Sequence, residues 1–271
     1  MYQTSMFSQE KPVLPRLSVI YEPAGRAREY APLSCNIYSG CDHGCIYCYA
    51  PAATRRKRES FHSSHERRGF LDKLRKDARK IKAAGYKGRV LLCFTCDPYQ
   101  SLDSDLCLTR QTIEILHGAG LDITVLTKGG SRALRDLDLF TPRDAFAATL
   151  TFGRDGDPWR KWEPGAAPPS DRIKTLRLFH QAGIPTWTSL EPVIEFEEAY
   201  SIILQTTRFV NLYKIGKMNY WPGCNDKDWG AFATKAIQLL KSLGYERIHN
   251  PDDATGLTRG FYIKNDLAAY L

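Results

Sequence analysis

Apolar runs typical of strands alternate regularly with helical patterns from residue 89 to residue 243. Parallel strands joined by helices of about 10–15 residues give this pattern. We expect strands at 89–94, 122–126, 145–150, 186–190 and 212–215, and helices at 109–119, 131–137, 170–182, 197–205 and 227–243. A further strand at 34–38 and a helix at 67–84 precede them. The chain is therefore predicted to be an α/β protein built on parallel strands.

Six strands in 271 residues fit either an open barrel of six βα units or a doubly wound sheet. The order of strands and helices alone does not separate these two architectures. No run of about 18 apolar residues is present, and the first residues lack the apolar region of a secretory signal. We therefore expect a cytoplasmic protein without a membrane partner.

The net charge of +8 is concentrated in one segment. Residues 55–82 contain twelve Lys or Arg and four acidic residues, so this segment accounts for the whole excess. Such clustering favours a polyanionic partner that meets one face of the protein. The alternative is a solvated helix surface with no partner.

Four of the eight cysteines lie within fourteen residues, and three of them form the segment Cys41-Asp-His-Gly-Cys45-Ile-Tyr-Cys48. In a chain without an export signal, such cysteines are more typical of metal binding or catalysis than of disulfides. Three thiolates on a short loop suit a [4Fe–4S] cluster whose fourth iron has no protein ligand and can bind a cofactor. Gly40 and Gly44 permit a tight turn around the inorganic core.

Two other interpretations of the cysteines stay open. Zinc sites usually have four protein ligands, so a zinc knuckle would need Cys35 or His43 to complete it. The cysteines can also be buried thiols that bind no metal.

The CxxxCxΦC pattern, with Tyr47 as the aromatic residue, resembles that of the radical S-adenosylmethionine superfamily. The longer segment 36–50, NIYSGCDHGCIYCYA, resembles the spore photoproduct lyase and DNA repair photolyase-like branch of that superfamily. The resemblance continues in order between residues 34 and 195, through segments 95–100, 108–110, 126–129, 135–139, 148–151, 162–165 with Arg172, and 183–194. It implies a partial (β/α)6-type TIM barrel of parallel strands, with the Fe–S cluster loop after the first strand.

On this basis we divide the chain into three parts. We expect an irregular leader at 1–30, the partial barrel at 31–245, and a C-terminal extension at 246–271 packed on the barrel. No internal repeat or linker indicates a second domain.

By resemblance, Cys41, Cys45 and Cys48 bind the cluster, and S-adenosylmethionine chelates its open iron. An electron from an external flavodoxin- or ferredoxin-type donor would then cleave S-adenosylmethionine into methionine and a 5′-deoxyadenosyl radical. The residues expected to contact this cofactor are Tyr47, Thr95, Asp97, Lys128 and Thr149. Glu163 and Arg172 are either a ribose-contacting pair or a structural ion pair.

The sequence departs from the lyase pattern at one position. The lyase carries a hydrogen-donating cysteine three residues before the aspartate of the second strand, and Phe94 occupies that position here. If the strand continues, side-chain alternation places Cys96 on the face of Phe94 and turns Cys93 away. Cys96 is therefore a candidate catalytic hydrogen donor, with a buried packing cysteine as the alternative.

The basic segment follows the cluster loop directly, so we expect it near the opening of the cofactor site. Phosphates of a DNA substrate are expected to bind Arg55, Arg56, Lys57, Arg58, Arg67 and Arg68. Side chains expected to stack on an exposed base are Tyr49, Tyr99, Phe152, Trp159 and Trp162. A base inside a duplex cannot reach a buried radical, so it would have to be flipped out or distorted.

Three functional hypotheses follow. The first is a lyase-like radical enzyme that repairs a thymine-type lesion or modifies a pyrimidine in DNA. The second is a radical enzyme that acts on a peptide or small metabolite. The third is a zinc-stabilised nucleic-acid-binding protein without enzymatic activity. The oligomeric state is left open by the sequence.

Overall fold

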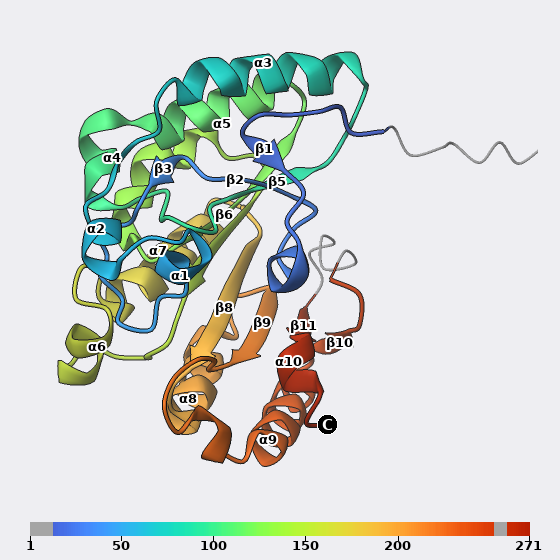
Figure 1. The fold of residues 1–271 in the computed structure, drawn as a ribbon. Helices are drawn as coiled ribbons and strands as arrows, with labels where there is room; N and C mark the ends of the chain where they lie inside the picture. The colour runs from blue at the N-terminus through green and yellow to red at the C-terminus, as the bar shows by residue number, and fades with distance from the viewer. Residues whose placement is uncertain (1–12, 252–258) are drawn as a thin grey trace, which may run out of the picture.

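A nine-stranded sheet runs through the computed structural model, which describes residues 13–251 and 259–271 (Figure 1). Its strands are β1 (Ile20–Tyr21), β2 (Leu33–Cys35), β5 (Arg89–Leu92), β6 (Asp122–Thr127), β7 (Ala145–Thr149), β8 (Thr186–Val193), β9 (Leu212–Lys217), β10 (Glu246–Ile248) and β11 (Gly260–Ile263). Their order across the sheet is β1-β2-β5-β6-β7-β8-β9-β11-β10. A separate two-stranded sheet pairs β3 (Tyr38–Ser39) with β4 (His65–Glu66).

The central six strands form a partial TIM barrel. Strands β2 and β5 to β9 follow one another in chain order, and each neighbouring pair is parallel. Helices cross back between them, as parallel pairing requires. The predicted α/β architecture of six βα units is confirmed, and the sheet continues beyond it through β11 and β10.

Helices cover the outer face of the curved sheet, with α3 and α5 over one half and α8 and α9 over the other (Figure 1). The α-helices are α1 (Ala50–Ala53), α2 (Arg58–His62), α3 (Phe70–Ala83), α4 (Ser101–Leu106), α5 (Leu108–Gly118), α6 (Asp157–Trp162), α7 (Pro169–Gln181), α8 (Phe196–Thr206), α9 (Trp229–Ser242) and α10 (Asn265–Ala268). The 3-10 helices are η1 (Gly25–Glu29), η2 (Gly130–Leu139) and η3 (Cys224–Asp226). The helix expected at 131–137 is thus a 3-10 helix.

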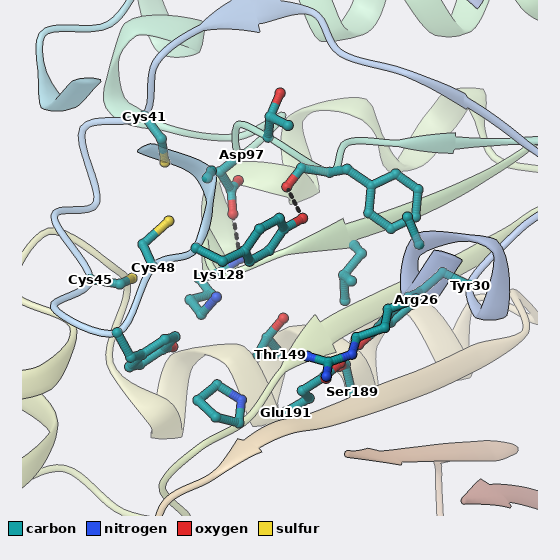
Figure 2. Close-up of a pocket in the computed structure, with 18 of the residues that line it drawn as sticks. Arg26, Tyr30, Cys41, Cys45, Cys48, Asp97, Lys128, Thr149, Ser189 and Glu191 are labelled. Atoms are coloured by element: carbon teal, nitrogen blue, oxygen red, sulfur yellow. Dashed lines mark hydrogen bonds between the residues drawn. The ribbon is translucent and has the colours of Figure 1, made fainter. Parts of the chain in front are cut away.

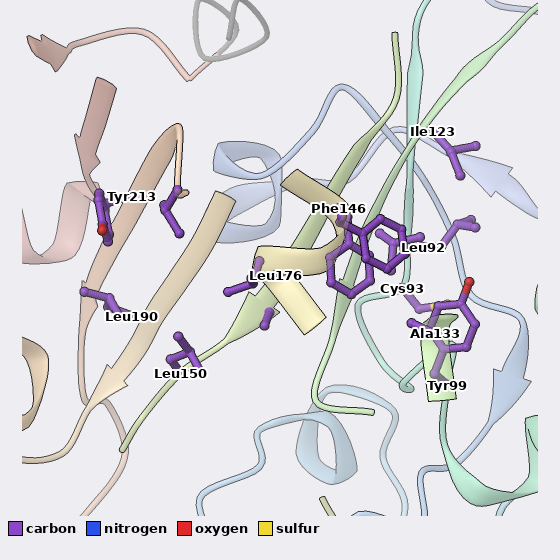
Figure 3. Close-up of a cluster of buried hydrophobic side chains, with 14 of the residues drawn as sticks. Leu92, Cys93, Tyr99, Ile123, Ala133, Phe146, Leu150, Leu176, Leu190 and Tyr213 are labelled. Carbon is purple, nitrogen blue, oxygen red and sulfur yellow. The ribbon is translucent and has the colours of Figure 1, made fainter. Parts of the chain in front are cut away.

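Side chains on the strands alternate between two apolar layers. Leu92 and Phe146 point outward and pack against the helices, where Phe146 stacks on Phe179 at 3.8 Å between ring centroids (Figure 3). Leu91 and Trp187 belong to a smaller cluster on the opposite face of the strands. Because successive side chains alternate between the two faces, the smaller cluster fills the inside of the barrel. The alternation also fixes the strand register, because a slip of one residue would exchange the two layers.

Two predicted strands end earlier than expected, and one side chain explains both differences. The Asn36 side-chain oxygen accepts hydrogen bonds from the backbone N–H groups of Phe94 at 2.8 Å and Thr95 at 2.9 Å. These N–H groups therefore pair with a side chain, and β5 ends at Leu92. The strand expected at 34–38 is likewise divided into β2 and β3 around Asn36.

Both ends of the described chain join the barrel sheet. In the segment assigned to the leader, β1 lies antiparallel to β2, while residues 1–12 lie outside the described residues. In the segment assigned to the extension, β11 lies parallel to β9 and β10 lies parallel to β11. Residues 252–258 also lie outside the described residues, and the three-part division of the chain stays a prediction. None of the helices in the described parts has the length and hydrophobicity that a bilayer span requires.

Candidate active site

The three motif cysteines lie on the loop between β3 and α1. Their sulfur atoms point into one shared space at one end of a cavity (Figure 2). The loop is held from outside by backbone hydrogen bonds from Cys41 N–H to the Phe61 carbonyl (3.1 Å) and from Ile46 N–H to the Trp162 carbonyl (3.0 Å). Because these bonds come from distant segments, the loop conformation depends on the tertiary structure.

Gly40 makes the turn into the cysteine loop possible. Its φ is +85°, and a Cβ atom there would lie 2.4 Å from the Phe61 carbonyl oxygen. A side chain would thus be both strained and sterically blocked. The predicted role of Gly40 in a tight turn agrees with this geometry.

The donor atoms suit a cluster better than a single metal ion. Among the described residues, no group of three His, Cys, Asp or Glu side chains converges closely enough to bind one ion. A single zinc needs each sulfur at about 2.3 Å, whereas cluster sulfurs bind separate irons and stand further apart. Cys35 is fully buried in the core, and both His43 ring nitrogens are engaged, Nδ1 with Asp97 at 3.5 Å and Nε2 with Arg132 at 3.0 Å. Neither residue is placed to complete a zinc knuckle.

The cavity has a volume of about 310 Å³ and lies at the carboxyl ends of the barrel strands. The cysteines line one end of it, and Arg26, Tyr30 and Glu191 line the other, with Lys128 and Thr149 between them (Figure 2). All five residues expected to contact the cofactor line this cavity, namely Tyr47, Thr95, Asp97, Lys128 and Thr149. The carboxyl edge of a parallel barrel is where active sites of this architecture form.

Asp97 organises the strand ends beside the cysteines. Its carboxylate accepts hydrogen bonds from the Thr127 hydroxyl at 2.5 Å, from Lys128 N–H at 2.7 Å and from Tyr99 N–H at 2.8 Å. Burial raises the pKa of Asp97, but the His43 contact and these hydrogen bonds outweigh it and leave the pKa below its ordinary value. Asp97 is therefore an ionised anchor that fixes the backbone on which Lys128 stands.

Glu163 and Arg172 form a buried ion pair behind the cavity wall. They are 0% and 1% exposed, and their Oε2 and guanidinium nitrogen lie 2.5 Å apart. Tyr47 donates its hydroxyl hydrogen to Glu163, and the Lys128 ammonium lies 5.6 Å from the Tyr47 ring centroid. Neither member of the pair lines the cavity, so the structural ion pair is the better interpretation. The pair sets the orientation of the Tyr47 ring.

Cys93 does not point away from Cys96, contrary to the prediction. Both side chains line the cavity, and both are buried, at 4% and 7% exposed. The alternation argument fails because β5 ends at Leu92, before either cysteine. Burial, followed by a side-chain contact with Cys96, raises the pKa of the Cys93 thiol well above its ordinary value. Cys96 Sγ in turn accepts a hydrogen bond from Tyr38 N–H at 3.4 Å.

Three of the six cationic residues expected to contact phosphate bind the chain itself. Arg58 donates to the carbonyls of Cys45 and Cys48, both at 3.1 Å, Arg56 donates to the Ser39 hydroxyl at 3.0 Å, and Arg67 donates to the Asn36 carbonyl at 2.7 Å. Arg55, Lys57 and Arg68 are exposed. The remaining basic residues of the segment are exposed side chains of helix α3, which lies beside α5 (Figure 1). Among the described residues, none between 51 and 92 lines the cavity.

Of the five aromatic residues expected to stack on a base, only Tyr49 is both exposed and in the lining of the cavity. Tyr49 lines the cavity and is 50% exposed. Tyr99, Phe152 and Trp159 are buried in the main apolar cluster, and Trp162 packs against that cluster. An exposed aromatic residue that the sequence analysis missed, Tyr220, also lines the cavity and is 85% exposed.

The end of the cavity opposite the cysteines was not predicted. Its charged residues come from the leader (Arg26), from β8 (Glu191), from the end of β9 (Lys217) and from the C-terminal segment (Lys264). Glu191 accepts hydrogen bonds from the Tyr30 hydroxyl and the Lys264 ammonium, both at 2.5 Å. These residues share no motif or spacing, so only the folded chain brings them together.

Comparisons with known proteins identify the family of the chain. The model of the Radical SAM superfamily matches residues 35–209. The uncharacterized protein MJ0683 of Methanocaldococcus jannaschii is 26% identical over 186 residues, which cover 68% of this chain and 69% of that protein.

Solved structures show the same fold at low identity. A spore photoproduct lyase variant has a TM-score of 0.64 at 12% identity and covers 93% of this chain and 80% of its own. Another variant of that lyase, with bound AdoMet and dinucleoside spore photoproduct, has a TM-score of 0.62 at 14% identity and covers 86% and 76%. SuiB of Streptococcus suis bound to S-adenosylmethionine has a TM-score of 0.56 at 11% identity and covers 78% of this chain and 48% of SuiB.

The matched family region contains the cysteine loop and strands β5 to β8, which line the cavity at their carboxyl ends. Three cysteine sulfurs around one open space, with an ionised Asp97 and a neighbouring Lys128, fit a cluster and the polar groups of S-adenosylmethionine. The hypothesis of a zinc-stabilised nucleic-acid-binding protein is therefore rejected in favour of a cluster-binding enzyme. The chain belongs to the radical S-adenosylmethionine superfamily, and its cofactors are a [4Fe–4S] cluster and S-adenosylmethionine.

Proposed function

We propose that this protein is a radical enzyme that acts on a base of a nucleic acid, as in spore photoproduct lyase-like repair or pyrimidine modification of DNA. With its cofactors bound, the site would cleave S-adenosylmethionine reductively and supply a 5′-deoxyadenosyl radical that abstracts hydrogen from the substrate. An external flavodoxin- or ferredoxin-type protein would supply the electron.

The chain's own residues would bind and orient the cofactor. Cys41, Cys45 and Cys48 would hold the cluster, and the Lys128 ammonium would meet the carboxylate of the methionine part. Lys128 is suited to this role because its backbone N–H is bound to Asp97 at 2.7 Å and its side chain lies over the Tyr47 ring. Apolar side chains of the cavity wall, including the buried Cys93 and the partly buried Leu126, would keep water away from the radical.

The observation that carries the substrate proposal is the pair of exposed tyrosines at the cavity opening. Tyr49 and Tyr220 both line the cavity and are 50% and 85% exposed. Exposed aromatic rings beside a site are the usual platform for stacking on an unpaired base. The Arg26 guanidinium lies 5.5 Å from the centroid of the Tyr220 ring, which adds a cation beside that platform.

Release of 5′-deoxyadenosine by the anaerobically reconstituted enzyme tests this proposal. We expect release to increase with single-stranded or lesion-containing DNA and to stay at its basal rate with unrelated peptides. Stimulation by a peptide or a small metabolite alone would contradict the proposal and favour the second hypothesis made from the sequence.

Replacement of Tyr220 tests the stacking platform. Stacking on one aromatic ring contributes about 1–3 kcal/mol, so Tyr220→Ala should weaken binding of single-stranded DNA about 5- to 150-fold. Fluorescence anisotropy with a labelled oligonucleotide measures this loss. Leu204→Ala is the matched control, because Leu204 is 55% exposed on α8 and does not line the cavity. Equal affinities for the two variants would exclude Tyr220 as a platform.

Cys96 stays our candidate for returning a hydrogen atom to the product radical. The S–H bond would break homolytically, and the resulting thiyl radical would take one electron from the external donor and a proton from solvent. Deuterium from heavy water should enter the product of the wild-type enzyme but not that of Cys96→Ala. Cys224→Ala is the control, because Cys224 is buried and does not line the cavity. Unchanged labelling in Cys96→Ala would remove Cys96 from the mechanism.

A further inference from the structure

Lys217 ends β9 and lines the cavity, with only 8% of its surface exposed. Its ammonium lies 5.8 Å from the centroid of the Trp229 ring and 5.7 Å from that of Tyr270. Among residues 13–251 and 259–271, no carboxylate or other acceptor bonds this ammonium. Aromatic faces partly stabilise a cation, but they do not replace the water that burial removes.

The other cations at this end of the cavity all have anionic partners. Lys264 lies 2.5 Å from Glu191 and 3.5 Å from Glu29. Arg26 lies 3.6 Å from Asp266. Among the described residues, Lys217 therefore differs from these neighbours, because its buried ammonium meets aromatic rings but no anionic partner.

The surroundings of Lys217 connect it to the opening of the cavity. The Asn219 amide donates to the Lys217 carbonyl at 3.0 Å and to the Asp266 carboxylate at 2.7 Å. Since Asp266 also contacts Arg26, the backbone at the end of β9 is tied to the Arg26 and Tyr220 side of the opening. Arg26 and Asn219 both contact Oδ2 of Asp266.

An uncompensated buried ammonium destabilises the ligand-free protein, so its presence in a cavity indicates a ligand that brings negative charge. Tyr220, the proposed base-stacking residue, lines the same cavity. A phosphate is the anion that accompanies a base in a nucleic acid, and a lysine ammonium binds it as a point charge.

We infer that Lys217 is an anion-binding subsite that takes the phosphodiester next to the reacting base. This assignment rests on the proposed function and makes it more specific: the substrate is a nucleotide within a strand, held by its base and by one flanking phosphate. Arg26 is placed to assist from the opening, while Lys217 reaches the phosphate from inside the cavity.

Binding of two labelled thymidylate strands to the reconstituted enzyme tests the subsite. One strand has ordinary phosphodiesters, and the other has uncharged methylphosphonate linkages. Wild-type protein should prefer the charged strand by about tenfold or more, the worth of one charge-assisted hydrogen bond. Lys217→Met should reduce this preference to about twofold, whereas Lys217→Arg should retain it. In Lys217→Met the slope of log Kd against log salt concentration should also be smaller by about one, because one phosphate contact is lost.

Lys241→Met is the matched control, because Lys241 is exposed on α9 and does not line the cavity. It should keep the wild-type preference. If Lys217→Met keeps that preference too, or loses affinity equally for both strands, the subsite is refuted while the proposed function stands.

Thermal unfolding supplies a readout that does not need a nucleic acid. Ligand-free Lys217→Met should melt at or above the wild-type Tm, because the hydrocarbon chain is kept and the uncompensated charge is removed. Inorganic phosphate should raise the Tm of wild type but not that of Lys217→Met. If neither DNA strand binds or stimulates 5′-deoxyadenosine release, the proposed function fails, and this phosphate response alone decides whether the subsite exists. Stabilisation by thymidine monophosphate with no binding of the strands would assign the phosphate to a free nucleotide and overturn the phosphodiester.

Discussion

Replacement of Cys45 by serine is expected to abolish cluster assembly and, with it, cleavage of S-adenosylmethionine. Cys45 is 6% exposed and points into the space that Cys41 and Cys48 also face (Figure 2). A serine hydroxyl is a poor ligand for iron in a cubane. Changes to residues behind metal ligands cost about 10- to 100-fold, so loss of a ligand itself should cost more than about 100-fold in 5′-deoxyadenosine release.

Iron and acid-labile sulfide analysis of anaerobically purified protein measures the first effect, and chromatography of 5′-deoxyadenosine measures the second. Cys224→Ser is the matched control, because Cys224 is also buried, at 6% exposed, but lies outside the cavity. It should retain the wild-type iron content. A Cys45→Ser protein with full iron, sulfide and 5′-deoxyadenosine release would contradict the assignment of the three ligands.

The second large effect is expected on stability, from Glu163→Gln. Removal of this charge leaves the Arg172 guanidinium buried at 1% exposure without a carboxylate partner among the described residues. Its hydrogen bonds then go to neutral acceptors alone, the Ala167 and Thr149 carbonyls and the amide oxygen of the new side chain. Removing one partner of a buried ion pair costs about 3–5 kcal/mol, mostly through the unpaired charge that remains. Urea unfolding under anaerobic conditions should show this loss. The Tyr47 hydroxyl loses a charged acceptor at the same time, so the side chain beside the cofactor should also lose its fixed orientation.

Two controls separate this effect from general damage. The double variant Glu163→Gln/Arg172→Met should recover part of the loss, because it removes both charges. Arg143→Met breaks the exposed pair with Asp122, where the side chains are 76% and 31% exposed, and should cost only about 0–1 kcal/mol. A loss below about 1 kcal/mol in Glu163→Gln would mean that the pair has no structural role.

The pair also predicts a direction for the effect of pH. Burial raises the pKa of Glu163, but the charges of Arg172 and Lys128 and the two side-chain hydrogen bonds outweigh it, so the folded pKa lies below the ordinary carboxyl value. The stabilisation from this group is therefore complete above the pKa of the unfolded chain. It is lost as the pH falls through the folded pKa. The Glu163→Gln variant should lack this part of the acid sensitivity.

Most of the barrel could be predicted from the sequence because its signals are local. All six predicted strands are present in the sheet, since each is a short apolar run between turn and helix signals. Their exact ends were not predictable. Asn36 binds backbone groups of Phe94 and Thr95, 58 and 59 residues away, and thereby ends two strands early. The misplacement of Cys93 followed directly from that error.

The sequence by itself was enough to predict the family, its cofactors and the residues at the cysteine end of the cavity. The spacing of Cys41, Cys45 and Cys48 is contained in eight residues, so the predicted ligand set does not depend on how the rest of the chain folds. The lysine and aspartate beside them were found through short motifs at strand ends.

Only the tertiary structure decided the opposite end of the cavity and what the basic residues do. Arg26, Lys217 and Lys264 come from segments far apart in the chain and meet because β11 adds to the sheet beside β9. Arg58 and Arg67 were expected to bind phosphate, but in the structure they donate hydrogen bonds to backbone carbonyls of the chain itself. Local sequence patterns specify which side chains a segment carries. Strand register and packing decide which side chains from distant segments come together, and a substrate pocket depends on that tertiary arrangement.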